Sequence, residues 1–170
     1  MDAKLVPPDV RYKESCLAAL REQEEIRESR EGSTEEAALD FAGFVEKLKS
    51  QARGENLPEG FIPQTVFWLV EGDEYIGRLD IRHHLTEHLR QIGGHIGYGI
   101  RPSKRRQGYG RLILKLGLEK AKEMGIEKVL VTCDVTNVGS RKIIEANGGV
   151  MENEIQVDGS PDKARFWIQS

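Results

Sequence analysis

The segment Arg105–Gly110 has the residue types and the spacing that anion binding requires. It reads Arg-Arg-Gln-Gly-Tyr-Gly, and a run with the apolar periodicity of a helix follows it directly. Glycine at positions 108 and 110 permits positive φ and lets the backbone approach a ligand closely. The first N–H groups of a helix point toward the same place, and the helix dipole favours negative charge there. We therefore expect this turn to bind a phosphate or pyrophosphate; the alternative is an ordinary basic loop that caps a helix.

Two common nucleotide-binding motifs do not describe this segment. A P-loop requires GxxxxGK[ST], but no lysine follows the second glycine here. The dinucleotide fingerprint requires three glycines spaced GxGxxG after a first strand, and the segment lacks the third. The surrounding elements must therefore indicate which ligand the turn binds.

Hydrophobic periodicity predicts the elements that position this turn. Residues 9–28 carry many helix formers, and Ser33–Glu36 is a capping box that opens a second helix, which ends near Gln51. After a loop over 54–63, apolar residues recur at every second position, as they do in strands. The expected strands are 65–70, 75–82, 95–100, 128–133, 150–157 and 164–168, and the later helices are 110–124 and 138–146.

The order of these elements predicts a mixed α/β fold. A strand, a helix and another strand in succession make a right-handed crossover, which leaves the strands 95–100 and 128–133 parallel. The hairpin over 65–82 is antiparallel, with Arg78, Asp80 and Arg82 on a solvated face. We therefore expect a mostly antiparallel twisted sheet with one central parallel pair.

The composition indicates one globular domain. The chain has 170 residues, of which 38% are hydrophobic and 31% are charged. Its net charge of −3 argues against a general nucleic-acid binder, although residues 101–111 are locally basic. Cys16 and Cys133 form no CxxC pair, and no stretch approaches the ~18 apolar residues of a membrane span. We expect a cytoplasmic protein with no nucleic-acid or membrane partner.

Two stretches of the chain resemble the GNAT superfamily of N-acetyltransferases. Residues 96–104 form an apolar strand end and a connection, and Arg105–Gly110 then match the family motif [Q/R]-x-x-G-x-[G/A] at the start of a helix. A second family element follows in the correct order. It consists of Thr132-Cys133-Asp134 at a strand end, then Asn137, Ser140 and Gly148-Gly149. The resemblance covers roughly residues 65–157.

The resemblance implies a cofactor and a way of binding it. It implies helices on both faces of the sheet and a central parallel pair that is splayed to admit acetyl-CoA. Ile100 would bind the pantetheine arm and polarise the thioester carbonyl, and Asn137 would contact the same arm with Ser140 nearby. The pyrophosphate would lie on the main-chain N–H groups of the turn, which are those of Arg105, Arg106, Gln107, Gly108, Tyr109 and Gly110. For Asn137 the alternative is a helix N-cap.

The implied reaction needs a base, because an amine with a pKa near 10.4 is almost entirely protonated at pH 7. His95 is the candidate, since imidazole titrates near working pH and the residue lies on the strand that leads to the turn. The alternative is a histidine that only hydrogen-bonds within the sheet. The general acid is unassigned, because Ile144 stands where many family members carry a tyrosine. Tyr98, Cys133 or water would have to replace it.

The other histidines do not indicate a metal site. His84 and His88 are four residues apart, but Glu87 is misplaced for an HExxH zinc helix. The charged side chains of this region line a substrate entrance or form a solvated face; they are Arg78, Arg82, His83, His84 and Arg90. An entrance of this kind favours a substrate that carries a carboxylate or phosphate beside its amine.

The sequence therefore predicts a single N-acetyltransferase domain over residues 1–170, which moves an acetyl group from acetyl-CoA to a primary amine of a small molecule or peptide by direct attack. Residues 1–60 supply helices and an acceptor-side loop, 65–157 the cofactor motifs, and 158–170 the closing strand. The alternative is a catalytically weak acyl-CoA-binding or sensory domain, which the missing tyrosine favours. An RNA-directed acetylating toxin would be basic, so the acidic balance counts against it. The oligomeric state is open, with a homodimer among the options.

Overall fold

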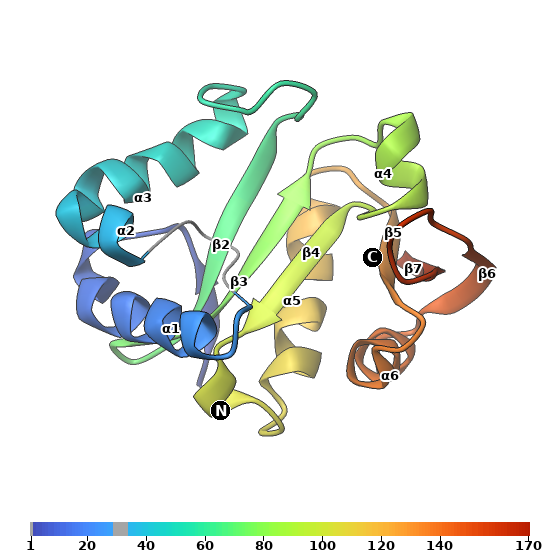
Figure 1. The fold of residues 1–170 in the computed structure, drawn as a ribbon. Helices are drawn as coiled ribbons and strands as arrows, with labels where there is room; N and C mark the ends of the chain where they lie inside the picture. The colour runs from blue at the N-terminus through green and yellow to red at the C-terminus, as the bar shows by residue number, and fades with distance from the viewer. Residues whose placement is uncertain (1, 29–33) are drawn as a thin grey trace.

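The computed structural model describes residues 2–28 and 34–170 (Figure 1). Within this part of the chain the strands are β1 (Lys4–Val6), β2 (Gln64–Glu71), β3 (Glu74–Arg82), β4 (Ile96–Ile100), β5 (Lys128–Asp134), β6 (Val150–Ile155) and β7 (Lys163–Gln169). The α-helices are α1 (Lys13–Glu25), α2 (Thr34–Leu39), α3 (Phe41–Ser50), α4 (Glu87–Gln91), α5 (Tyr109–Glu123) and α6 (Val138–Ala146). The 3-10 helices are η1 (Val10–Tyr12), η2 (Gln51–Arg53) and η3 (Pro102–Lys104).

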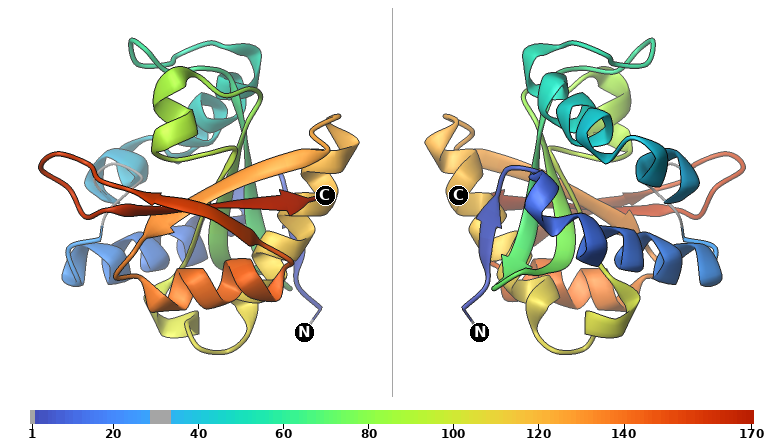
Figure 2. Two further views of the ribbon diagram at one scale, coloured as in Figure 1. Left: turned by 90° about the vertical axis from the view of Figure 1, so that its right-hand side faces the viewer. Right: turned by 90° about the vertical axis from the view of Figure 1, so that its left-hand side faces the viewer.

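The strands form two antiparallel sheets. The first has the order β1-β2-β3-β4 and the second the order β5-β7-β6. In the left view of Figure 2 the second sheet lies in front, and its strands run across those of the first. The two sheets meet where a bridge joins Gly94 to Val131, and this bridge is antiparallel. The predicted parallel pairing of β4 with β5 is therefore not confirmed, whereas the mixed α/β class and the antiparallel pairings are.

Each face of the first sheet is covered by helices, as the sequence predicted. The left view of Figure 2 shows this sheet nearly edge-on, with α1, α2 and α3 on one side and α5 on the other. Alternate side chains of β2 enter the two cores: Leu69 packs on the α5 side, and Trp68 packs on the α1–α3 side. The apolar side chains of α3 are buried in this second core; they include Phe41, Val45 and Leu48.

Several predicted elements differ from those of the structure. The helix expected to run to Gln51 is divided at Asp40, whose side chain accepts from the Gly43 N–H and caps α3. The capping box at Ser33 lies outside the described residues. Strand β1 and helix α4 were not predicted, because elements of three and five residues are too short to show a period. None of the helices within residues 2–28 and 34–170 is long and apolar enough to cross a membrane.

The solvated face predicted for β3 is only partly confirmed. The side chains of Arg78 and Asp80 are 17% and 20% exposed, so most of their surface is covered. Nε of Arg78 donates to Oδ1 of Asp80 over 2.7 Å, and this ion pair allows both charges to be half-buried.

Candidate functional site

The turn before α5 has the geometry that anion binding requires. Arg106 has φ +60° and Gly108, the N-cap of α5, has φ +90°, so the backbone curls as it enters the helix. The main-chain N–H groups of residues 106–111 donate no hydrogen bond within the described part of the chain. They lie at the N-terminus of a 15-residue helix, where the dipole favours an anion. The turn can therefore hold a phosphate group with main-chain donors alone.

Side chains of the turn brace it from outside. Nε of Arg105 donates to the Ile100 carbonyl over 3.1 Å, and Nε2 of Gln107 donates to the Ser103 carbonyl over 3.0 Å. The Tyr109 hydroxyl donates to the Glu71 carboxylate over 2.6 Å. These side chains are committed to holding the loop in shape, so the predicted role of the turn rests on its backbone.

Helix α1 fixes the connection between β4 and the turn. Arg101 is 7% exposed and forms an ion pair with Glu22 of α1, whose carboxylate also accepts the Ser103 N–H over 3.0 Å. Burial alone would raise the pKa of Glu22, but the hydrogen bonds from Arg101 and Ser103 lower it to about 2. This contact could not be predicted from the sequence, because its partners are 79 residues apart and belong to no motif.

The register of β4 leaves main-chain groups directed toward the second sheet. The Arg101 N–H donates to the Ile76 carbonyl, and the Arg82 N–H donates to the His95 carbonyl, so the odd-numbered residues of β4 pair with β3. The N–H and C=O groups of Tyr98 and Ile100 point the other way. Within the described residues neither N–H has a partner, and the Ile100 carbonyl accepts from Arg105. An amide-bearing ligand could pair with this edge as an added strand does.

His95 lies just before β4, at the end away from the turn, and is about 16 Å from Ile100 at the usual rise of a strand. Its main-chain N–H donates to the Leu130 carbonyl over 2.7 Å, and its ring Nδ1 accepts the Leu130 N–H over 2.9 Å. Burial, with the charges of Arg90 and Arg82, lowers the pKa of His95 to about 4. In the neutral ring Nε2 then carries the proton. This geometry favours the structural alternative, and the role of base stays a prediction.

Asn137 and Ser140 lie at the start of α6. The Asn137 side chain accepts the Ser140 N–H over 3.0 Å, which is the N-cap geometry that was the alternative for this residue. The Ser140 hydroxyl lies 3.0 Å from the Tyr98 hydroxyl and so joins α6 to β4. Burial raises the pKa of Tyr98 to about 12. The start of α6 is thus next to the unpaired edge of β4.

Cys133, the other side chain named as a possible proton donor, lies in the core, and so does Ile144, which stands in place of the family's tyrosine. Ile144 is fully buried and packs in the cluster around α5. Cys133 is 7% exposed, and burial raises the pKa of its thiol. A buried thiol with a raised pKa is a poor nucleophile. It therefore offers no support for a covalent enzyme intermediate.

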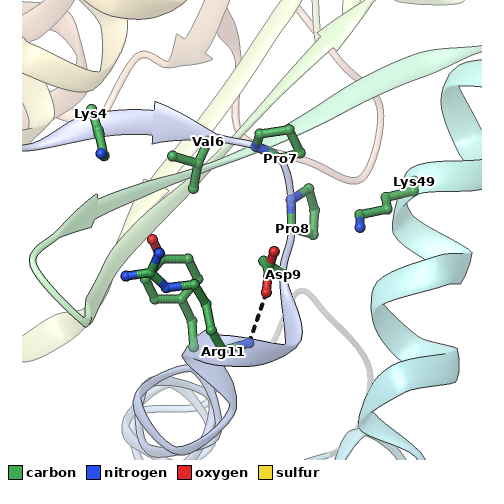
Figure 3. Close-up of a pocket in the computed structure, with 8 residues that line it drawn as sticks. Lys4, Val6, Pro7, Pro8, Asp9, Arg11 and Lys49 are labelled. Atoms are coloured by element: carbon green, nitrogen blue, oxygen red, sulfur yellow. Dashed lines mark hydrogen bonds between the residues drawn. The ribbon is translucent and has the colours of Figure 1, made fainter.

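A separate cavity of about 270 Å³ lies at the β1 edge of the first sheet (Figure 3). Its lining includes Lys4, Arg11 and Lys49 from three different elements. None of the residues predicted for the site lines it. Among the residues described, no group of three or more His, Cys, Asp or Glu side chains gathers as metal ligands do.

Residues 5–150 match the model of the acetyltransferase (GNAT) domain family. This match confirms the family predicted from the two motifs, and with it an acetyltransferase activity that uses acetyl-CoA. No curated protein matches the chain.

Solved structures share the whole fold. RimJ of Mycobacterium smegmatis, in complex with CoA-disulfide, is 18% identical with a TM-score of 0.73, and the alignment covers 99% of this chain and 82% of RimJ. The microcin C7 self-immunity acetyltransferase MccE, in complex with acetyl-CoA and AMP, is 13% identical with a TM-score of 0.70 and coverage of 99% and 92%. A Salmonella typhimurium acetyltransferase that modifies the N-terminal serine of ribosomal protein L7/L12 is 15% identical, with a TM-score of 0.68 and coverage of 99% and 95%. At these identities the likeness shows the fold alone.

Proposed function

The chain belongs to the GNAT acetyltransferase family, and we propose that it transfers the acetyl group of acetyl-CoA to a primary amine by direct attack. One observation carries the proposal. Main-chain N–H groups that have no partner among the described residues occur in the turn at 106–111 and at Ile100 and Tyr98 on β4. The donors at the turn suit a pyrophosphate, and those on β4 suit the amides of a pantetheine arm and a thioester carbonyl.

Acetyl-CoA supplies an activated acyl group with a leaving thiol whose pKa is about 8.5. The residues of this chain orient that group and supply protons. The N–H groups of β4 hold a carbonyl in place, and the hydroxyl pair of Tyr98 and Ser140 lies beside the same strand end. Burial raises the pKa of Tyr98 to about 12, so its hydroxyl is protonated at neutral pH. The 3.0 Å contact gives that proton a path through Ser140 to the leaving thiolate, as the C–S bond breaks and the attacking amine loses its own proton. We propose this pair as the general acid in place of the missing tyrosine.

The acceptor class is proposed as the amine of a peptide or a small molecule. Among proteins of the same fold, one acts on the N-terminal serine of L7/L12, another is described as a ribosomal L7/L12 alpha-N-protein acetyltransferase, and MccE confers immunity to a microcin. The activities of these proteins support an amine as the acceptor of this chain, but they do not identify which amine it is. Cytoplasmic location and a homodimer stay predictions from the sequence.

The second candidate is an acyl-CoA-binding sensory domain. One observation favours it: Ile144, fully buried, occupies the position of the general-acid tyrosine. Both candidates predict that acetyl-CoA raises the melting temperature, by an amount that grows with its concentration above Kd.

The deciding experiment is a thiol-release assay with acetyl-CoA and a panel of peptides, amino acids and other small amines. We expect CoA thiol to be released faster with at least one amine, and the acetylated product to appear in equal amount by mass spectrometry. Binding of acetyl-CoA without amine-dependent release across the panel would favour the sensor. Absence of any acetyl-CoA-dependent melting shift would reject both.

A further inference from the structure

One face of β3 and β4 carries a half-buried carboxylate between two arginines, above two glycines. In the register of these strands Asp80 is opposite Gly97, and Arg78 is opposite Gly99. The residues between them, such as Leu79, pack in the core against α5, so the charged side chains project from the opposite face. We call this surface the glycine face; it consists of Arg78, Asp80, Arg82, Gly97 and Gly99.

The two glycines leave the backbone of β4 bare on this face. Among the described residues, no atom lies within 4 Å of a methyl group built on Gly99. One built on Gly97 would lie 3.5 Å from Nη2 of Arg82 and 3.9 Å from Oδ2 of Asp80. These two side chains therefore overhang the strand, and the space beside them is open to a ligand.

Among the described residues, only one carboxylate oxygen of Asp80 accepts a hydrogen bond. Oδ1 accepts Nε–H of Arg78 over 2.7 Å. Oδ2 is the oxygen near Gly97, and within the described residues it has no hydrogen-bond partner. A carboxylate that is 20% exposed gains from a further donor, because water hydrates it only in part. An ammonium group supplies such a donor with the matching charge.

The charges around Asp80 restrict which amine fits. Nη1 of Arg82 donates to the carbonyls of Gly93 and Gly94 over 3.0 and 3.1 Å, which fixes this guanidinium beside the carboxylate. One negative charge between two positive ones complements a ligand with a single ammonium group next to an electron-rich oxygen. An α-amino group with its adjacent carbonyl has this pattern. A polyamine brings several cations and is repelled by the arginines.

We propose that the glycine face binds the α-amino group of the acceptor, with the ammonium on Oδ2 of Asp80 and the adjacent carbonyl or carboxylate oxygen toward the arginines. This inference rests on the proposed function and names its substrate class. The bound amine lies over Gly97 and so next to Tyr98, whose N–H points toward the second sheet. The α-amino group can belong to a peptide N-terminus or to a free amino acid.

The test compares the wild-type protein with Asp80→Asn, Asp80→Glu and the control Asp73→Asn. Asp73 lies at the tip of the same hairpin, and its side chain is 92% exposed. The acceptors are a tripeptide with a free N-terminus, its N-acetylated form, a free amino acid, an Nα-acetylated lysine amide and a polyamine. We expect the α-amino acceptors to react best in wild type. Asp80→Asn should raise their KM at least tenfold with the KM for acetyl-CoA unchanged, Asp80→Glu should restore part of the loss, and Asp73→Asn should match wild type.

Calorimetric titration of the tripeptide into the CoA-bound protein gives a readout without turnover. We expect binding in wild type and Asp73→Asn, and a tenfold or greater loss in Asp80→Asn. If the wild-type protein acetylates amines, and Asp80→Asn has the same KM for the acceptor and the same affinity for the peptide, this inference is overturned. That result would not count against the proposed function. Preference for the polyamine or the lysine side chain would also overturn it. A wild type that acetylates no amine instead rejects the proposed function. The melting shift with acetyl-CoA shows that each variant is folded.

Discussion

Two hydrogen bonds join His95 to the backbone of Leu130. One comes from the main-chain N–H of His95, and the other is accepted by its imidazole ring. The Leu130 N–H donates to Nδ1 over 2.9 Å, and the His95 N–H donates to the Leu130 carbonyl over 2.7 Å. The ring therefore replaces a main-chain acceptor at the place where the first sheet meets the second. Because that place is buried, the charged form of the ring is disfavoured.

The first prediction concerns stability at low pH. The pKa of His95 is lowered from 6.5 to about 4, so the unfolded chain takes up the proton more readily than the folded one. The free energy of unfolding therefore decreases as the pH falls from 6.5 toward 4, by on the order of 1–2 kcal/mol between pH 7 and 5. His95→Asn keeps an acceptor for the Leu130 N–H but does not titrate. In urea unfolding it should show a shallower dependence on pH than wild type, and equal slopes would contradict the assigned pKa.

The second prediction concerns the role of His95 in turnover. Since Nδ1 already accepts a hydrogen bond, the ring can take a further proton only by becoming a buried cation. We expect His95→Asn to keep the shape of the wild-type pH profile for kcat/KM with a reactive amine. A variant that loses turnover below pH 8 and regains it at higher pH would instead identify His95 as the base.

The third prediction concerns the contact between α1 and the connection to the turn. The pKa of Glu22 is lowered from 4.5 to about 2, so its stabilising contribution is complete above pH 4.5 and is lost as the pH falls toward 2. Glu22→Gln should unfold more easily at pH 7, by about 2 kcal/mol, because the buried Arg101 then loses the nearer of its two carboxylate partners and keeps only Glu74, at 3.5 Å. Acid titrations followed by circular dichroism should converge for the two proteins near pH 2. Glu25→Gln, an exposed position on the same helix, is the control; a difference that persists at pH 2 would contradict the ion-pair argument.

Features set by neighbouring residues could be predicted from the sequence. The glycines at 108 and 110 and the helical period after them belong to one short segment, and the structure has the expected helix start there. Contacts between distant segments could not be predicted in this way. Glu22 and Arg101 stand in no shared pattern, and the function of the His95 ring depends on an N–H that β5 supplies.

The position of Asp80 shows the same limit for the site. The alternation of β3 predicted the face on which Asp80 lies, but it predicted solvent around that face. The half-buried state depends on Arg78 and on Arg82, which the carbonyls of Gly93 and Gly94 hold in place. A pattern of alternating residues carries no information about such partners, so the candidate acceptor site became visible only in three dimensions.

The fourth prediction tests the hydroxyl pair as a proton donor. Tyr98→Phe removes the hydroxyl that lies 3.0 Å from Ser140 and leaves the aromatic ring in place. If the pair protonates the leaving thiol, kcat should fall about 100-fold or more with the KM for acetyl-CoA little changed. Tyr12→Phe, in the core on the other face of the first sheet, is the control. Equal kcat in Tyr98→Phe and wild type would leave Cys133 or water as the donor.

The fifth prediction tests anion binding by the turn and compares substitutions of the glycines at the two ends of α5. Gly108 precedes α5 with φ +90°, and Gly125 follows it with φ +81°, so a side chain at either position meets a similar backbone cost of about 1–2 kcal/mol. Gly108→Glu places a carboxylate among the N–H groups that suit a pyrophosphate, where it also interacts favourably with the helix dipole. We expect this variant to stay folded and to lose the melting shift with acetyl-CoA, whereas Gly125→Glu keeps it. If both variants keep the full shift, the pyrophosphate binds elsewhere, because a glutamate in that turn would occupy the donors and repel the phosphate charge.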